Sequence, residues 1–466
     1  MLFPDFVVAE EKVVHSPEYF KQWEASHDKL NIRNSSEMFT DTSNSFLAVP
    51  GDYPDIRNFE VAQTPPTVDF GIIQGYEPTY LPSYYYEDHK RGGLWEGYGD
   101  VTRGPDDRYY FSIGDHRSYG GNAYIFRYDP KDRTCVPVVD LKTFMGWKPD
   151  EFVDGKVHGD IDIGPGGDTW FLTYFGPGPT KQEWDTAYRG SWLFHFNIYS
   201  NELECLGIPL EGSSWPYYNY DYERNLLFGV SHEDGIVISY DTNARRMLYG
   251  GAAKHGIAWY SRCTMLDKET GVFYSSSPDP ENPGVGRIVS YKRRNNEFTW
   301  LNSTLPANPA MNGKLPGFRS HTSDKDDDGA FWCFTSQGMF FRFYPAEDRT
   351  ELIGPNWGKN GYYTVNMSFS PGKRYIYYVP SQTGSYKLGT PVVQYDTEKN
   401  RMKVIAFLRD FYAEKFNYHT GGPWGIEIST DGESLIFYTA GSFGEESTYR
   451  RPAMFQLHIP ASERVE

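Results

Sequence analysis

The stretch Phe126-Arg127-Tyr128-Asp129-Pro130 decides how the whole chain is interpreted, because copies of it return further along the sequence. Aromatic residues followed by an aspartate and a turn former are typical of a β-strand that enters a tight turn. The clear copies are Ile238-Ser239-Tyr240-Asp241-Thr242, Phe341-Arg342-Phe343-Tyr344-Pro345 and Val393-Gln394-Tyr395-Asp396-Thr397, and weaker copies end at Phe196-Asn197, Tyr291-Lys292 and Leu457-His458. The chain therefore contains seven copies of one unit.

Each unit also contains an earlier strand that is rich in Phe, Tyr and Trp. These strands are expected at residues 109–111, 169–171, 226–228, 272–274, 330–332, 375–377 and 435–437. Several follow Gly- or Asp-containing turns, such as Pro165-Gly166-Gly167 and Thr430-Asp431-Gly432, which supply the positive-φ positions of tight hairpins. The units are about 44 to 68 residues apart, which is the spacing of four-stranded propeller blades with variable loops.

The sequence predicts an all-β fold, a seven-bladed β-propeller formed by residues 91–466 as a single domain. Residues 1–90 do not repeat, so we expect them to form an irregular N-terminal extension packed on the propeller. A strand from this extension, such as Phe6-Val7-Val8-Ala9, is expected to complete the last blade and close the ring.

Composition supports this fold and excludes some partners. Aromatic residues make up 17% of the 466 residues, with 46 Gly and 31 Pro, as expected for many short strands joined by tight turns. The net charge of -17 argues against nucleic acid and anionic membranes as partners, since proteins that bind them gather Lys and Arg on one face. No stretch approaches the ~18 apolar residues of a membrane helix. We expect a monomer.

The cysteines and the first residues bear on the cellular compartment. Cys135, Cys205, Cys263 and Cys333 are widely spaced, which favours four free thiols over a disulfide framework or a zinc site. The start Met1-Leu2-Phe3-Pro4-Asp5 has no basic segment followed by an apolar one. We therefore expect either an intracellular protein or an extracellular or periplasmic protein from which a signal peptide has been removed.

The first strand of each propeller blade lines the central channel, so polar residues at the starts of these strands are candidates for the functional site. The candidates for catalysis are His158, Tyr174, Tyr218 and Arg262, and those for substrate binding are His116, Trp215, Arg319, His321, His419 and Trp424. Each of these residues, taken alone, has an ordinary structural explanation. Their convergence from several blades on one axis favours a functional site.

Arg, His and Tyr among aromatic walls suit chemistry on an acidic sugar. Trp and Tyr stack on pyranose rings, and Arg binds a carboxylate through its fork of donors. In β-elimination from a uronate, the neutralised carboxylate makes the C5 proton more acidic, a His or Tyr removes it, and a Tyr or His protonates the leaving oxygen at C4. No paired Asp/Glu arrangement stands out at these positions, which disfavours the two-carboxylate mechanism of most glycosidases.

Two motifs resemble a known family. Gly155-Lys156-Val157-His158-Gly159 leading into Trp170-Phe171, and Gly114-Asp115-His116 with the following Tyr-x-x-Arg-Tyr-Asp-Pro, are similar to segments of the seven-bladed propeller polysaccharide lyases, which include ulvan lyases and rhamnose–glucuronate lyases. The resemblance is best over residues 95–300. It implies that His158 belongs to the active site, together with a Tyr and an Arg whose nearest matches are Tyr218 and Arg262.

This chain departs from the family at one position and leaves several functions open. Tyr174 stands where relatives commonly have a second His, so it is expected either to replace that His as the proton carrier or to mark a different substrate or a lost activity. The leading hypothesis is a lyase acting on a uronate-containing polysaccharide or oligosaccharide. The alternatives are a glycoside hydrolase acting on a capped acidic glycan and a non-catalytic propeller that binds a glycan or a protein. No cofactor is required, although His321 or His419 could ligate a calcium or zinc ion in the channel.

Overall fold

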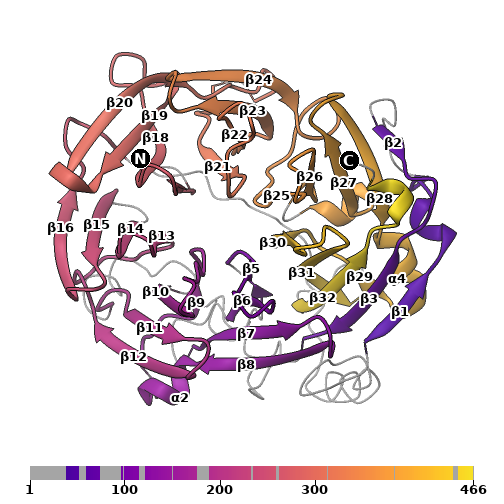
Figure 1. Ribbon diagram of the computed structural model, residues 1–466, viewed down its shortest axis with the longest axis horizontal. Coiled ribbons are helices and arrows are strands. Elements are labelled where there is room, and N and C mark those ends of the chain that lie inside the picture. Colours follow the sequence, from indigo (N-terminus) through magenta and orange to yellow (C-terminus); the bar gives the residue numbers. More distant parts are fainter. Residues whose placement is uncertain are drawn as a thin grey trace, which may run out of the picture.

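The protein is a seven-bladed β-propeller in a computed structural model, in which seven sheets are arranged as a ring around a central axis (Figure 1). The structure describes residues 38–51, 59–73, 96–97, 99–114, 121–148, 151–175, 188–231, 235–258, 262–311, 313–381, 384–443 and 450–464. In each blade the chain runs from the axis outward through antiparallel strands, so the first strands face the channel. The predicted all-β, seven-bladed fold is confirmed.

Blades one to four contain seventeen strands in chain order. They are β4 (Glu96–Gly97), β5 (Thr102–Arg103), β6 (Tyr109–Gly114), β7 (Ala123–Asp129) and β8 (Thr134–Asp140); β9 (Lys156–Val157), β10 (Asp168–Tyr174), β11 (Leu193–Asn197) and β12 (Glu202–Gly207); β13 (Tyr217–Asp221), β14 (Leu226–Val230), β15 (Ile236–Asp241) and β16 (Arg246–Ala252); and β17 (Met265–Asp267), β18 (Val272–Pro278), β19 (Gly286–Lys292) and β20 (Glu297–Thr304).

Blades five to seven continue the ring. They are built from β21 (Phe318–His321), β22 (Phe331–Thr335), β23 (Met339–Tyr344) and β24 (Arg349–Pro355); β25 (Ser368–Phe369), β26 (Tyr375–Tyr378), β27 (Pro391–Asp396) and β28 (Arg401–Phe407); and β29 (Tyr418–His419), β30 (Pro423–Ile428), β31 (Ser434–Phe443) and β32 (Arg450–His458). The described helices are short: α2 (Leu141–Met145), α4 (Arg409–Phe416), and the 3-10 turns η2 (Asn44–Leu47), η5 (Arg293–Asn295), η6 (Ser385–Leu388) and η7 (Ala461–Glu463).

The repeated sequence unit coincides with the blade. All seven expected third strands end at the residues where the sequence places them, at Asp129, Asn197, Asp241, Lys292, Tyr344, Asp396 and His458. In every blade, one residue of the turn before the predicted aromatic-rich strand has a positive φ. These residues are Asp107, Gly167, Asn225, Gly271, Gly329, Lys373 and Gly432. Such turns match the twist of the strands that they join, which is why the predicted Gly and Asp turns recur.

The aspartate that ends several third strands organises the turn that follows it. The Oδ1 atom of Asp129 accepts hydrogen bonds from the backbone N–H groups of Lys131 (3.0 Å) and Asp132 (3.4 Å), and its Oδ2 atom pairs with Arg108 Nε at 2.7 Å. Asp396 repeats this arrangement, with Lys399 N at 3.1 Å and Arg374 Nη2 at 3.0 Å. The aspartate of the aromatic-Asp motif therefore stabilises the turn that follows the strand, and the motif is part of the scaffold and not of a site.

Strands from the N-terminal region join the last two blades. β3 (Thr67–Ile72) pairs antiparallel with β32, and β1 (Phe39–Thr42) pairs with β3, so the seventh sheet contains both ends of the described chain (Figure 1). β2 (Phe59–Val61) adds to β28 of blade six in parallel. The expected closing strand at residues 6–9 lies outside the described residues, and the strand found at this position is β3.

Aromatic side chains fill the spaces between blades. Phe111 of blade one, for example, is fully buried, and its ring lies 4.8 Å from that of Tyr438 in blade seven. All four cysteines are free thiols, two of them buried. Within the part of the chain that the structure describes, no helix is long and apolar enough to cross a membrane.

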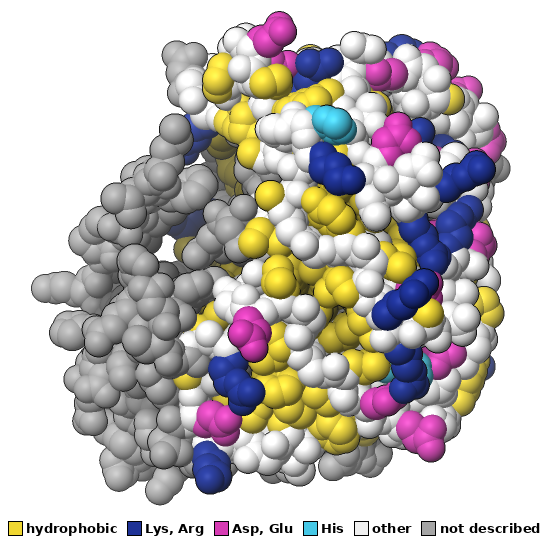
Figure 2. Space-filling model, turned by 90° about the vertical axis from the view of Figure 1, so that its left-hand side faces the viewer, with side chains coloured by type: hydrophobic (Ala, Val, Ile, Leu, Met, Phe, Trp, Pro, Cys, Tyr) yellow, Lys and Arg dark blue, Asp and Glu magenta, His cyan; other side chains and the backbone are white. Residues whose placement is uncertain are grey.

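The fourth strands form the partly exposed outer wall, as in β16 and β24. Figure 2 shows one side of this wall, where Lys and Arg side chains are interspersed with Asp, Glu and apolar ones.

Candidate functional site

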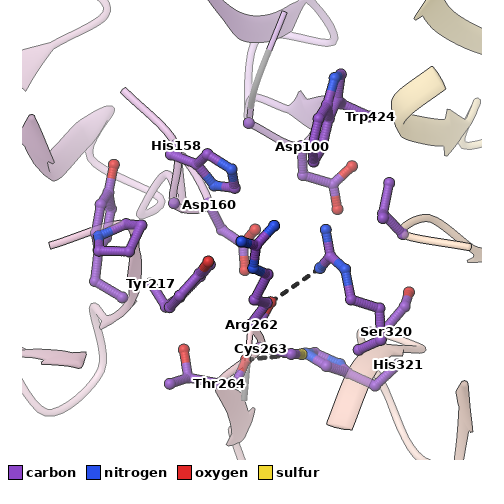
Figure 3. Close-up of a pocket in the computed structure, with 16 residues that line it drawn as sticks. Asp100, His158, Asp160, Tyr217, Arg262, Cys263, Thr264, Ser320, His321 and Trp424 are labelled. Carbon is purple, nitrogen blue, oxygen red and sulfur yellow. Dashed lines mark hydrogen bonds between the residues drawn. The ribbon is translucent and has the colours of Figure 1, made fainter. Parts of the chain in front are cut away.

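A pocket lies on the propeller axis, and all seven blades contribute to it. Its lining residues are Gly99, Asp100, His158, Gly159, Asp160, Pro216, Tyr217, Tyr218, Arg262, Cys263, Thr264, Arg319, Ser320, His321, Val365 and Trp424. Most of them stand at the starts of the innermost strands or just before them. Because only a propeller brings these distant segments together, the pocket is a product of the whole ring (Figure 3).

His158 follows the short inner strand β9 and is half buried at the pocket wall. Its ring is edge-on to three aromatic rings: Trp424 at 5.4 Å, Tyr174 at 5.6 Å and Tyr217 at 5.6 Å. Burial, together with the positive charges of Lys156, Arg319 and Arg262, lowers the pKa of His158 well below its usual value. His158 is therefore a neutral imidazole at pH 7, the form that can accept a proton.

Arg262 presents a solvent-exposed guanidinium in the middle of the pocket, between His158 and His321 (Figure 3). No carboxylate of the described residues forms an ion pair with it. The phenols of Tyr217, Tyr363 and Tyr174 surround it, and the pKa of Arg262 is raised mainly by Tyr217. A cationic fork of donors that is open to solvent and is not neutralised by the protein suits an anionic ligand.

Arg319 of β21 is buried, with 7% of its surface exposed. Its Nε atom donates to the Tyr363 hydroxyl at 2.6 Å, and its Nη1 atom donates to the backbone carbonyl of Arg262 at 2.9 Å. Its guanidinium also lies over the rings of Tyr363 (4.9 Å) and Trp424 (6.0 Å). The predicted substrate-binding Arg319 thus connects residues of blades four, six and seven.

Tyr217 and Tyr218 both line the pocket but differ in environment. The ring of Tyr218 packs on Gly159, where an added Cβ atom would lie 2.4 Å from a ring carbon, and only 1% of Tyr218 is exposed. Burial raises its pKa well above the usual value. Tyr217 instead contacts the His158 ring and lies close to Arg262, and burial raises its pKa to about 12. Of these two tyrosines, Tyr217 is therefore the one that contacts the His158 ring, and it stands one residue before the predicted Tyr218.

Tyr174 and Trp424 both meet His158, as the sequence analysis expected of residues at the same site. Tyr174 pairs with Lys156 across β9 and β10, and the Lys156 ammonium lies 5.0 Å from the Tyr174 ring centre. Trp424 of β30 is partly exposed and lines the pocket, so it offers an aromatic face beside the guanidinium of Arg319.

Three other predicted residues lie in positions that do not suit substrate binding, and a fourth is outside the described residues. Trp215 is fully buried in the core between blades, so it cannot touch a substrate. Both ring nitrogens of His321 lie near backbone carbonyls, those of Thr322 (2.9 Å) and Thr264 (3.2 Å), and thus serve the scaffold. His419 stands in β29 and does not line this pocket. His116 lies outside the described residues.

Two carboxyl groups in the pocket were missed by the sequence analysis. Asp100 and Asp160 both line it, and burial raises the pKa of Asp160 to about 7, with the charge of Asp162 acting in the same direction. Burial and the nearby Asp160 also raise the pKa of Asp100 well above the usual value. The expectation that no carboxyl pair stands at the axial site was therefore wrong. Asp160 is only two residues beyond His158, a spacing that in extended chain directs both side chains to one face.

A metal site was a further expectation from the sequence. Among the residues that the structure describes, no group of three or more His, Cys, Asp and Glu side chains is arranged to hold a metal ion. The metal expectation therefore stays a prediction.

Comparisons with known proteins give no family for this chain. No protein-family model and no curated protein matches the sequence. Two similar solved structures are those of the extracellular domain of BT4673 from B. thetaiotaomicron, described once as a one component system and once as a hybrid two component system. Each is 9% identical, with TM-scores of 0.48 and 0.49, and each match covers 77% of this chain and 38% of the other. This chain therefore spans well under half the length of those proteins.

The chain is thus a seven-bladed β-propeller with an axial pocket that combines a neutral His, an open Arg, tyrosines and a Trp face. A propeller of this kind is compatible with a domain that binds or processes a carbohydrate.

Proposed function

We propose that the protein is a polysaccharide lyase that cleaves a uronate-containing glycan by β-elimination at the axial pocket. The observation that carries the proposal is the pairing of an exposed, unneutralised Arg262 guanidinium with the neutral imidazole of His158 in one pocket. The guanidinium can bind the substrate's carboxylate, and the neutral imidazole can accept the proton that must be removed from C5.

Each step of the reaction has a side chain that suits it. Arg262 binds the uronate carboxylate and stabilises the negative charge that develops when the C5–H bond breaks. His158 takes the C5 proton, and the electron pair left on C5 forms the C4–C5 double bond as the C4–O bond breaks. Tyr217, still protonated at neutral pH because its pKa is about 12, gives its proton to the leaving oxygen.

The site then returns to its starting state without any outside reagent. After elimination His158 is an imidazolium and Tyr217 is a phenolate, and their rings are 5.6 Å apart between centres. Transfer of the proton from the imidazolium to the phenolate restores both groups. Trp424 supplies a face on which a neighbouring sugar ring stacks.

Ultraviolet absorbance during incubation with a panel of uronate-containing polysaccharides tests the proposal, because elimination creates an absorbing unsaturated uronate. We expect absorbance to rise with the wild type and to be abolished in His158→Ala and Arg262→Ala. The matched controls are His195→Gln and Arg246→Ala, which change a His of blade two outside the pocket and an exposed Arg of β16. No absorbance change with any polymer, or equal activity in His158→Ala, would contradict the proposal.

A glycoside hydrolase acting on an acidic glycan is the second candidate, and Asp100 and Asp160 favour it. The pKa of Asp160, about 7, suits a general acid, which is one of the two carboxyl roles that glycosidases require. The two reactions give different products. New reducing ends without ultraviolet absorbance would identify the hydrolase, and binding without any product would identify a glycan-binding propeller.

A further inference from the structure

Tyr363 lies beside Arg319 and near Arg262, the two arginines of the pocket, although neither the sequence motifs nor the mechanism above uses it. We propose that Tyr363 is a substrate-contacting residue that binds the uronate carboxylate together with Arg262, by donating its phenol hydrogen to a carboxylate oxygen. This inference rests on the proposed function, because it concerns how the same site recognises the acid group.

The backbone around Tyr363 is fixed by its neighbours. The fully buried Asn356 accepts a hydrogen bond from the N–H of Tyr362 at 2.9 Å and donates to the carbonyl of Tyr362 at 2.8 Å. Its side chain also donates to the hydroxyl of the fully buried Thr364 at 2.8 Å. Because both flanking residues are held, the half-buried side chain of Tyr363 leaves the backbone from a defined position.

The hydrogen bonds at the Tyr363 hydroxyl determine which role its hydrogen can have. The Nε atom of Arg319 donates to this oxygen at 2.6 Å, and Arg319 also stacks over the ring at 4.9 Å. The second cation nearby is Arg262, whose pKa is raised by Tyr217 and by Tyr363. Arginine has only donors, so neither guanidinium can accept the phenol hydrogen.

Among the described residues, no acceptor takes the phenol hydrogen of Tyr363. A phenol oxygen that accepts from a cation holds its own hydrogen more loosely and donates it more strongly. An anionic acceptor that arrives beside Arg262 would therefore find a polarised O–H next to an open guanidinium. A carboxylate has two oxygens with about four acceptor positions and can engage both groups at once.

This pairing also predicts selectivity. A uronate carboxylate would accept from Arg262 and Tyr363 as a charged group, whereas its methyl ester is neutral and offers weaker acceptors. A hydrogen bond to a charged group contributes roughly 10- to 100-fold in affinity. Loss of the Tyr363 hydroxyl should thus weaken binding of the acid far more than binding of the ester.

The experiment measures calorimetric binding of a glucuronate disaccharide and of its carboxyl methyl ester to the whole chain. Tyr363→Phe keeps the ring under Arg319 and removes only the hydroxyl, and Tyr362→Phe is the matched control at the adjacent tyrosine. We expect Tyr363→Phe to raise the Kd for the acid about 10- to 100-fold and that for the ester no more than about 2-fold. The control should leave both values unchanged, and thermal unfolding confirms that both variants fold.

The outcomes separate this inference from the proposed function. If Tyr363→Phe binds the acid as tightly as the wild type does, this inference is wrong while the lyase proposal stands. If the wild type and Tyr363→Phe behave as expected but no elimination product forms, the lyase proposal is wrong while this inference stands. A wild type that does not prefer the acid over the ester would overturn both.

Discussion

The Nη1 atom of Arg319 donates a 2.9 Å hydrogen bond to the backbone carbonyl of Arg262, so one arginine of the pocket holds the main chain of the other. Arg319 is buried and bound on several sides, whereas Arg262 is exposed to the pocket. We therefore expect the two guanidiniums to differ in role, with Arg262 binding a ligand and Arg319 acting as a positioning residue.

Substitution Arg319→Lys should lower kcat/KM on a uronate substrate about 10- to 100-fold. A lysine has one ammonium in place of a planar fork, so it cannot bond Tyr363 and the Arg262 carbonyl with the same geometry, and small displacements at a reacting centre are costly. A double-mutant cycle with Tyr363→Phe gives a readout that general destabilisation would not move. Because Arg319 acts partly through Tyr363, the double variant should be less impaired than the product of the two single effects.

The control for Arg319 is Arg342→Lys in β23, which removes a guanidinium that pairs with Asp326 at 2.7 Å, and neither residue lines the pocket. That substitution should change stability and leave kcat/KM within about 2-fold. Fully multiplicative losses for Arg319 and Tyr363 would contradict the positioning role.

The pH dependence of kcat/KM should separate the lyase from the hydrolase. Burial and the charges of Lys156, Arg319 and Arg262 lower the pKa of His158 well below its usual 6.5. Protonation of His158 would stop the lyase, and it occurs only below that pH. Tyr217 keeps its proton up to about pH 12. Activity of a lyase should therefore be flat from about pH 7 to pH 10. A hydrolase that used Asp160 as its acid would lose activity as pH rises through about 7.

The measurement is kcat/KM from pH 5 to pH 10 at constant ionic strength, with Asp160→Asn as the comparison. A lyase should keep its flat region in this variant. A fall above pH 7 that disappears in Asp160→Asn would identify the carboxyl as the acid and would contradict the role of His158 as the base.

Tyr217 and Tyr218 can be distinguished by removing one hydroxyl at a time. Tyr217→Phe should lower kcat about 100- to 10,000-fold, the usual contribution of a general acid, with little change in KM. Tyr218→Phe should change kcat less than about 3-fold, because this side chain is 1% exposed and packs on Gly159. Steady-state kinetics of the two variants are sufficient, and a larger loss in Tyr218→Phe would restore the original sequence assignment.

The propeller ring could be predicted from the sequence because the signals for each blade lie within that blade's own stretch of sequence. The aromatic second strands, the strand-ending aspartates and the positive-φ turns are short-range signals, and Asp129 and Gly167 illustrate how directly they act. Strand β3 could not be predicted in the same way. It completes the last blade from nearly 390 residues away in the sequence, and no local pattern indicates its partner.

For the site, the sequence predicted which segments of the chain come together, but not which side chains of those segments face the pocket. His158, Arg262, Arg319 and Trp424 do line one pocket, because inner-strand starts must converge on the axis. The choice between Tyr217 and Tyr218 depends on a register of one residue, which reverses the face of a strand. The role proposed for Tyr363 and the place of Asp100 in the pocket depend on contacts between different blades, and such contacts leave no mark in the spacing of the sequence.

Gly159 offers a test of how closely the scaffold and the site are linked. It separates His158 from Asp160 and lies against the Tyr218 ring, where a Cβ atom would come within 2.4 Å of a ring carbon. Because that ring is buried and cannot swing away freely, Gly159→Ala should destabilise the protein by about 1–3 kcal/mol. It should also displace His158 and lower kcat about 10-fold or more.

The control is Gly250→Ala in β16, where the nearest atom to an added Cβ is a Met247 side-chain carbon at 3.8 Å. Denaturant unfolding and kinetics on both variants give the answer, and a Gly159→Ala protein with wild-type stability and activity would show that the Tyr218 ring can move aside.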